Sequence, residues 1–172
     1  MEILAYVIGR ERGHIDPLLI AVADRLLARG VRVCGTVQTN TDNPNGGHCD
    51  MDVRVLPDGP EIRISEERGA LARGCRLDAG ALEGAVGLVE AELDAGADCL
   101  IVNKFGKHEA EGHGFRDLIA KALALGVPVL VSVNKRNEEA FLAFADGLAT
   151  PLSPDATAME AWLSRQMAAA AA

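Results

Sequence analysis

Short apolar runs and longer amphipathic segments alternate along the N-terminal part of the sequence. Residues 3–8 form an apolar run that stops at Gly9, which predicts a buried strand entering a loop. Between Asp16 and Gly30, leucine, valine and alanine recur at helical spacing. Because Asp16 can act as an N-cap and Pro17 suits the first turn, we expect an amphipathic helix with defined ends.

The pattern then changes from strand and helix to a hairpin. Residues 31–37 predict a second strand, and the polar segment 38–47 predicts a turn-rich loop, a candidate mobile lid. Residues 51–55 and 61–65 alternate polar and apolar side chains on either side of a Pro-Asp-Gly turn. That alternation predicts an antiparallel hairpin with one solvated face.

Helices and strands alternate again in the C-terminal half. The predicted elements are a helix from Asp78 to Gly96, a strand over 98–102, a helix over 115–126, a strand over 127–133, a short helix after Asn137, an extended piece from Leu148 and a helix over 159–167. Strands separated by helices imply a mainly parallel sheet that is covered on both faces. We therefore expect one three-layer α/β domain over residues 1–167, with the hairpin as an edge extension and a frayed alanine-rich tail over 168–172.

Composition narrows the possible functions. The chain has 172 residues, of which 49% are hydrophobic, enough for one compact core. Its 17 Lys and Arg against 25 Asp and Glu give a net charge of −8, which argues against nucleic-acid or anionic-membrane binding. The sequence has no apolar stretch of membrane length and no basic leader, so a cytoplasmic protein is expected. Any anion site must therefore be local.

Ligands bind sheets of this kind beyond the carboxyl ends of the strands. Three segments follow predicted strands, namely 9–15, 38–49 and 103–114. These three segments are therefore where candidate ligand-binding side chains are sought.

The first of these segments places two glycines before a helix N-terminus, where backbone amides can cradle an anion. Its candidate residues are Gly9, Arg10, Arg12, Gly13, His14 and Asp16. A nucleotide-binding P-loop has the pattern Gly-x-x-x-x-Gly-Lys-Ser/Thr. Here only three residues separate the glycines, and His14 stands where the lysine is required. The motif fails, and the alternative interpretation is a tight turn that needs glycine.

Segment 103–114 crowds polar side chains directly after a predicted buried strand. Lys104, Lys107 and two histidines stand near Glu109 and Glu111. Such groups can clamp an anion, share protons or coordinate a metal. The alternative interpretation is a glycine-rich surface loop whose charges pair with one another and with water.

The four cysteines contain no Cys-x-x-Cys pair, so neither a zinc ribbon nor a dithiol redox motif is supported. Cys34 and Cys99 fall in strand patterns, where a thiol acts as a small hydrophobe. His48, Cys49 and Cys75 are candidates for a metal site, with packed thiols as the alternative interpretation. No Gly-x-Ser-x-Gly occurs, so we expect no nucleophilic catalysis.

Three segments carry a resemblance to a known family: residues 35–38, residues 74–78 and residues 100–114. Over nearly its whole length the chain resembles the bacterial domain-of-unknown-function family 2478, which is itself similar to small P-loop nucleoside triphosphatases. The second motif of those enzymes follows an apolar strand with Asp-Glu, and Asn103 and Lys104 stand there in this chain. The resemblance thus implies a degenerate nucleotide site that lacks its magnesium anchor. It also implies a role in molybdenum or tungsten handling, because family members are often found beside molybdate-uptake functions.

We therefore predict a binding module, a P-loop-like domain that holds a nucleotide or an oxyanion such as molybdate or tungstate without catalysis. The predicted ligand-binding residues are Gly9, Arg10, Arg12, Gly13, His14, Asp16, Gln38, Asn103, Lys104, Lys107 and Glu109. In this hypothesis Lys104 and Lys107 lie at the same edge of the sheet as the loop that begins at Gly9, and Glu109 orients one of the two lysines.

Two other functions stay open. A nucleotide-dependent phosphohydrolase with non-standard motifs would recruit magnesium through Glu109 or Glu111. A regulatory or assembly protein, or a homo-oligomer, would use the hairpin of residues 51–65 or the terminal helix with Trp162 as a contact surface.

Overall fold

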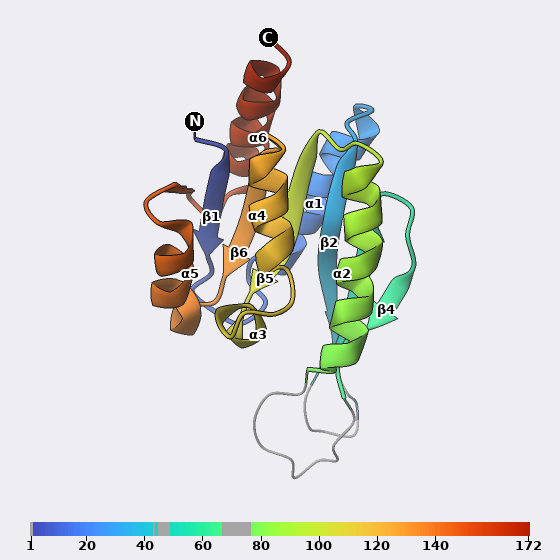
Figure 1. Ribbon diagram of the computed structural model, residues 1–172. Coiled ribbons are helices and arrows are strands. Elements are labelled where there is room, and N and C mark those ends of the chain that lie inside the picture. The colour runs from blue at the N-terminus through green and yellow to red at the C-terminus, as the bar shows by residue number, and fades with distance from the viewer. Residues whose placement is uncertain (1, 43, 45–48, 67–76) are drawn as a thin grey trace.

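The predicted strands and helices follow one another in the predicted order, with the short helix α3 (Lys107–Ala110) and a 3₁₀ helix in addition (Figure 1). The computed structural model describes residues 2–42, 44, 49–66 and 77–172. The strands are β1 (Leu4–Ile8), β2 (Val33–Thr41), β3 (Asp50–Leu56), β4 (Glu61–Arg63), β5 (Cys99–Phe105), β6 (Val129–Val133) and β7 (Ala149–Pro151). The helices are α1 (Asp16–Ala28), α2 (Ala79–Asp94), α3 (Lys107–Ala110), α4 (Arg116–Ala124), α5 (Glu138–Ala145) and α6 (Ala156–Ala170), with a 3₁₀ helix η1 (Lys135–Asn137).

The strands form one sheet in the order β4-β3-β2-β5-β6-β1-β7. From β2 to β7 neighbouring strands are parallel, whereas β3 is antiparallel to β2 and β4 is antiparallel to β3. The mainly parallel sheet with an antiparallel hairpin at its edge is therefore confirmed. The carboxyl ends of the parallel strands meet at one edge of the sheet, at the lower end of Figure 1 near α3.

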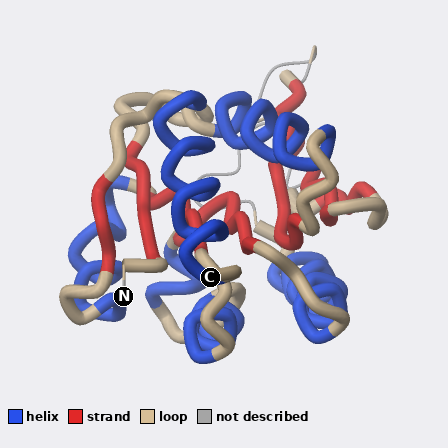
Figure 2. Tube along the Cα trace, turned by 90° about the horizontal axis from the view of Figure 1, so that it is seen from above, coloured by secondary structure: helices blue, strands red, loops and turns tan. Residues whose placement is uncertain are grey.

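Helices cover both faces of the sheet (Figure 2). Leu19 of α1 and Met159 of α6 belong to the core on one face. Val89 of α2, Ile119 of α4 and Phe141 of α5 belong to the core on the other face. The three-layer α/β architecture is thus as predicted, because alternate side chains of each strand supply the two cores. None of the helices in the described chain is long and apolar enough to span a lipid bilayer.

The predicted cap of α2 is correct and that of α1 is wrong. Asp78 accepts a hydrogen bond from the backbone N–H of Ala81 at 3.0 Å and begins α2. The N-cap of α1 is Ile15, which makes no side-chain capping hydrogen bond. Asp16 is instead the first residue of the helix, and its carboxylate binds side chains of two neighbouring strands.

Two strands extend further than the sequence predicts. β2 continues to Thr41, because residues 38–41 pair with residues 50–53 of β3 and their backbone groups are satisfied there. The prediction of a loop from residue 38 is wrong for this reason. Residues 43 and 45–48 of that candidate lid lie outside the described residues. β5 likewise continues to Phe105, three residues past its predicted end.

Trp162 belongs to the core rather than to a contact surface. Its side chain is 3% exposed and lies in the apolar layer that also holds Leu163. The hypothesis that Trp162 forms a protein contact surface is wrong, because α6 turns this residue toward the sheet. The helix itself continues to Ala170, three residues into the segment expected to fray.

Candidate functional site

The loop between β1 and α1 is a tight turn that requires its two glycines. A Cβ on Gly9 would lie 2.9 Å from Ile15 Cγ1, and Gly13 has a φ of +75°. The charged and imidazole side chains of this loop are exposed: Arg10, Arg12 and His14. The glycines therefore shape the turn, and the side chains between and beside them face solvent.

Four polar side chains form a closed ring of hydrogen bonds at the carboxyl ends of β2 and β5; we call them the polar ring. Asn40 Nδ2 donates to Asp16 Oδ2 at 2.6 Å, and Gln38 Nε2 donates to Asn40 Oδ1 at 2.8 Å. Asn103 Nδ2 donates to Gln38 Oε1 at 3.1 Å and to Asp16 Oδ1 at 3.3 Å. Gln38 and Asn103 are buried, Asp16 is half-buried and Asn40 is exposed.

The polar ring places a negative charge at the start of α1. Asp16 lies in the first turn, where the helix dipole favours an anion, and two side-chain N–H groups hold its carboxylate. A phosphate at this helix end would meet that carboxylate. Any contact with an external anion is therefore better made elsewhere in the site.

The turn after β5 is held by Glu109. Its Oε1 accepts from the N–H of Gly106 at 3.0 Å, and its Oε2 accepts from the N–H of Phe115 at 3.1 Å. The side chain is 3% exposed, and burial raises its pKa in spite of these hydrogen bonds. A Cβ on Gly114, whose φ is +61°, would overlap Glu109 Oε2. Within the described chain no ion pair joins Glu109 to a lysine, so its carboxylate holds backbone rather than the predicted lysine.

A second carboxylate holds the same turn from α2. Glu83 Oε1 accepts from the N–H of Gly114 at 2.7 Å and lies 2.8 Å from His108 Nε2. Desolvation raises the pKa of Glu83, but these hydrogen bonds and the histidine charges outweigh it and hold the pKa below its ordinary value. The ring of His113 lies 5.2 Å from that of His108, measured between centroids. The Nε2 of His108 is therefore engaged by the same Glu83 oxygen that binds the turn.

A cavity of about 140 Å³ lies where the first loop and the turn after β5 approach each other; we call it the carboxyl-edge cavity. Its apolar walls are Met51, Val53, Ile64, Leu77, Leu82 and Phe115. Three cations also line it: Arg12, Lys104 and Lys107. Among the described residues Arg12 and Lys104 have no ion pair, and Lys107 Nζ lies 3.8 Å from Glu111 Oε1. The chain is acidic overall, so this is a local concentration of positive charge.

The cavity brings together six of the residues predicted from the sequence and leaves five out. Those in its lining are Arg12, Gln38, Asn103, Lys104, Lys107 and Glu109. Those absent from its lining, as the described residues define it, are Gly9, Arg10, Gly13, His14 and Asp16. The two lysines thus share a cavity with the first loop, which is the arrangement that sheet topology predicts.

The sequence interpretation misses Asn40 and Glu83. Asn40 is two residues beyond Gln38, so both lie on one face of β2 once the strand is extended to Thr41. Continuing the strand alternation past residue 37 would have found Asn40. Glu83 lies on α2, and no local pattern links it to the turn after β5.

The family of the chain follows from a sequence match over nearly its whole length. The sequence profile of the family described as "Protein of unknown function (DUF2478)" matches residues 4–162. This chain belongs to the DUF2478 family. The DUF2478 chain is also 36% identical over 159 residues to the molybdenum import ATP-binding protein ModC 2 of Bradyrhizobium diazoefficiens. That match covers 92% of this chain and 18% of the other protein, so the chain spans less than a fifth of that relative's length.

Two solved structures share the fold of the DUF2478 chain. The crystal structure of THEP1 from the hyperthermophile Aquifex aeolicus has a TM-score of 0.60 and 16% identity, covering 94% of this chain and 95% of that one. The solution structure of a human cancer-related nucleoside triphosphatase has a TM-score of 0.57 and 18% identity, covering 86% of each chain. The DUF2478 chain therefore has a fold like that of the P-loop nucleoside triphosphatases, as its sequence predicts.

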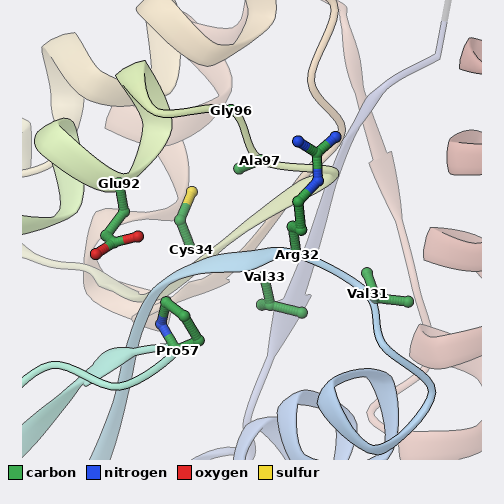
Figure 3. Close-up of a pocket in the computed structure, with 8 residues that line it drawn as sticks. All are labelled: Val31, Arg32, Val33, Cys34, Pro57, Glu92, Gly96 and Ala97. Carbon is green, nitrogen blue, oxygen red and sulfur yellow. The ribbon is translucent and has the colours of Figure 1, made fainter.

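A second cavity, of about 210 Å³, lies at the opposite edge of the DUF2478 sheet (Figure 3). The start of β2 and the segment before β5 contribute to it, with the thiol of Cys34 beside Gly96 and Ala97. Desolvation raises the pKa of Cys34 to about 12, and it raises the pKa of the buried Cys99 as well. Both thiols are therefore protonated at neutral pH and act as small hydrophobes, as predicted.

The candidate metal ligands gain no support from the described part of the DUF2478 chain. His48 and Cys75 lie outside the described residues. Cys49 Sγ lies 3.5 Å from Asp42 Oδ1. Within the described residues no group of three or more His, Cys, Asp or Glu side chains is placed to hold a metal ion.

Proposed function

We propose that this DUF2478 chain binds a nucleotide at the carboxyl-edge cavity. The phosphates would contact the three exposed cations of the cavity, which we call its rim, and the base would lie within the apolar walls. The observation that carries the proposal is the meeting of Arg12, Lys104 and Lys107 at one cavity. Two segments far apart in the sequence supply these cations to a chain whose net charge is −8. An anionic group of a ligand would neutralise them together.

The location of Asp16 supports binding at the rim rather than at the start of α1. Its carboxylate already occupies the electropositive end of the helix, held by Asn40 and Asn103. Lys104 and Arg12 are exposed and have no ion pair within the described chain, so they can reach a phosphate without breaking an existing contact. Phosphate binding through these side chains differs from backbone binding by a P-loop.

We propose binding without hydrolysis by the usual route of nucleoside triphosphatases. Asn103 and Lys104 stand where an aspartate and a glutamate would hold magnesium and position water. Both oxygens of Glu109 are engaged by backbone N–H groups, which disfavours Glu109 as a magnesium ligand. A phosphohydrolase would then depend on the exposed Glu111. Magnesium-dependent phosphate release that is lost in Glu111→Gln would favour that alternative.

A second candidate ligand is molybdate or tungstate. The similarity to a protein named for molybdenum import favours it, although the match covers 18% of that protein. A tetrahedral oxyanion would suit three cations as phosphate does. It would leave the apolar walls of the cavity without a partner, including Val53 and Leu82. We therefore propose a nucleotide rather than an oxyanion as the first candidate ligand, because of these apolar walls.

Isothermal calorimetry tests the proposal, with ATP and GTP measured with and without magnesium, followed by phosphate, molybdate and tungstate. We expect nucleotide binding that weakens about tenfold or more in Lys104→Ala, because a charge-assisted contact is removed. Arg165→Ala is the matched control, since it removes one cation from α6 that does not line the cavity. Thermal unfolding of both variants should match that of the unmodified chain.

Three outcomes of this titration are decisive. Unchanged affinity in Lys104→Ala would remove Lys104 from the site. An equal loss in Arg165→Ala would show that overall charge, rather than the cavity, determines binding. Binding of molybdate or tungstate without nucleotide binding would replace the nucleotide by the oxyanion.

A further inference from the structure

Two buried polar atoms in the wall of the carboxyl-edge cavity have no hydrogen-bond partner in the described part of the chain. They are Thr36 Oγ1 and Asn103 Oδ1. Their side chains are 1% and 3% exposed, and both line the cavity. Buried polar atoms are nearly always hydrogen-bonded, since an unmet one is costly. The two atoms therefore mark where a ligand would form hydrogen bonds.

The polar ring fixes which atom of Asn103 is left without a hydrogen-bond partner among the described residues. The carboxylate of Asp16 only accepts hydrogen bonds, so Asn40 must turn its NH₂ group toward it. The oxygen of Asn40 then faces the NH₂ group of Gln38, and the oxygen of Gln38 faces the NH₂ group of Asn103. The direct contact from Asn103 Nδ2 to Asp16 requires the same orientation. Both routes from Asp16 to Asn103, through Asn40 and Gln38 or directly, therefore leave the oxygen of Asn103 without a donor in the ring.

An orientation fixed in this way selects the polarity of the ligand. Asn103 Oδ1 can only accept a hydrogen bond, and it cannot exchange places with the NH₂ group of Asn103, because Asp16 Oδ1 and Gln38 Oε1 would then lose their donor. The hydroxyl of Thr36 both accepts and donates. The cavity wall thus offers one obligatory acceptor and one adaptable group, set among apolar side chains.

The size of the cavity indicates which part of a ligand lies there. Complete small-molecule sites occupy about 300–1,000 Å³. The cavity has about 140 Å³, so it holds one portion of a ligand. Its three cations, Arg12, Lys104 and Lys107, are exposed, whereas Thr36 and Asn103 are buried. This difference leaves the charged portion of a ligand outside and the uncharged portion against the two buried side chains.

We propose that Asn103 and Thr36 recognise an exocyclic amino group on the base of the bound nucleotide. Asn103 Oδ1 accepts one N–H of that amino group, and Thr36 Oγ1 bonds either its second hydrogen or the neighbouring ring nitrogen. Asp16, Gln38 and Asn40 are positioning residues that keep the oxygen of Asn103 toward the cavity. This inference rests on the proposed nucleotide binding and adds the feature by which the ligand is selected.

Paired nucleotides that differ in the amino group test the inference by calorimetry. The pairs are ATP with purine riboside triphosphate, GTP with ITP, and CTP with UTP. We expect about a tenfold preference for the amino-bearing member in at least one pair, the effect of one hydrogen bond to a buried acceptor. Equal affinity within every pair, with Lys104→Ala still weakening both members, would overturn the inference and leave the proposed function standing. Absence of binding by every nucleotide would overturn both.

Thr36→Val supplies a readout that does not depend on choosing a nucleotide, because it removes the hydroxyl and keeps the side-chain shape. The ligand-free variant should unfold at the same temperature as the unmodified chain or higher, since an unpaired buried hydroxyl has been removed. Its affinity for the preferred nucleotide should fall several-fold. Thr157→Val, an exposed threonine on α6, is the matched control. A lower unfolding temperature with unchanged affinity would assign Thr36 to the fold and overturn its role in recognition.

Discussion

At the scale of single residues, the carboxylate of Glu109 organises the turn that carries the lysines. Glu109→Ala removes the acceptor of two buried hydrogen bonds, those donated by the N–H groups of Gly106 and Phe115. We expect the free energy of unfolding to fall by about 2–4 kcal/mol, measured by urea denaturation followed by circular dichroism. Glu111→Ala, two residues further on and exposed, is the control and should change it by less than about 0.5 kcal/mol. Equal stability of the two variants would contradict this role of Glu109.

Glu83 predicts a dependence of stability on pH. Its pKa in the folded chain lies below the ordinary value of 4.5, so its contribution to stability is complete above that value and is lost as the pH falls through the folded pKa. The side chain is about half exposed, so we expect well under about 1 kcal/mol at neutral pH. Urea midpoints at pH 7 and pH 3 should therefore differ less for Glu83→Gln than for the unmodified chain.

The control for this measurement is Glu92→Gln, on the same helix and without a hydrogen bond to the turn in the described chain. It should keep the pH dependence of the unmodified chain. If Glu83→Gln and Glu92→Gln respond alike, the link between α2 and the turn contributes no stability.

The sequence locates single site residues where the chemistry is local. Asn103 and Lys104 could be selected as candidates because they directly follow the apolar run of a predicted strand, and both line the cavity. The role of Asp16 was not predictable, because its partners Asn40 and Asn103 come from two distant strands. The same holds for Glu109, whose acidic side chain in a lysine-rich turn suggests an ion pair, while its actual partners are backbone N–H groups.

At the scale of elements, the pairing of β2 with β5 depends on Gly35. This residue has a φ of +121°, and a Cβ there would overlap the carbonyl oxygen of Ile101, its partner in the ladder. We expect Gly35→Ala to lower the free energy of unfolding by about 3 kcal/mol or more, measured by chemical denaturation. The reason is that the two strands cannot stay hydrogen-bonded without a backbone shift.

A second glycine gives the matched control for this substitution. Gly87 lies on the exposed side of α2, with open space around the position of a Cβ. Gly87→Ala should raise the free energy of unfolding by about 0.5–1 kcal/mol, because alanine favours the helix. A similar response at positions 35 and 87 would show that the contact with Ile101 does not limit β2.

Element types were predictable from periodicity, whereas strand ends were not. The apolar runs of β1, β5 and β6 and the stripes of α1 and α2 carry their own signals. The last residues of β2 are polar. The polar composition of these residues by itself suggests a loop, and only the pairing with β3 makes them part of the strand.

At the scale of the whole molecule, the sheet topology decides where chemistry can occur. The rule that ligands bind at the carboxyl ends of parallel strands points to the edge of the sheet where the polar ring and the carboxyl-edge cavity both lie. The cavity itself could not be read from the sequence. Its lining comes from the first loop, β2, the hairpin, α2, β5 and the turn after β5, and only the assembled sheet brings these together. The fold thus brings cations from two separate segments into the lining of one cavity.

The closed polar ring also has a consequence for how the family diverges. Each amide in the ring takes its orientation from its neighbour, and Asp16 gives the circuit its direction. A single exchange at one of the four positions therefore leaves a mismatched pair elsewhere in the circuit. Among homologous sequences, positions 16, 38, 40 and 103 are expected to covary as a set, while the cations of the rim can change one at a time.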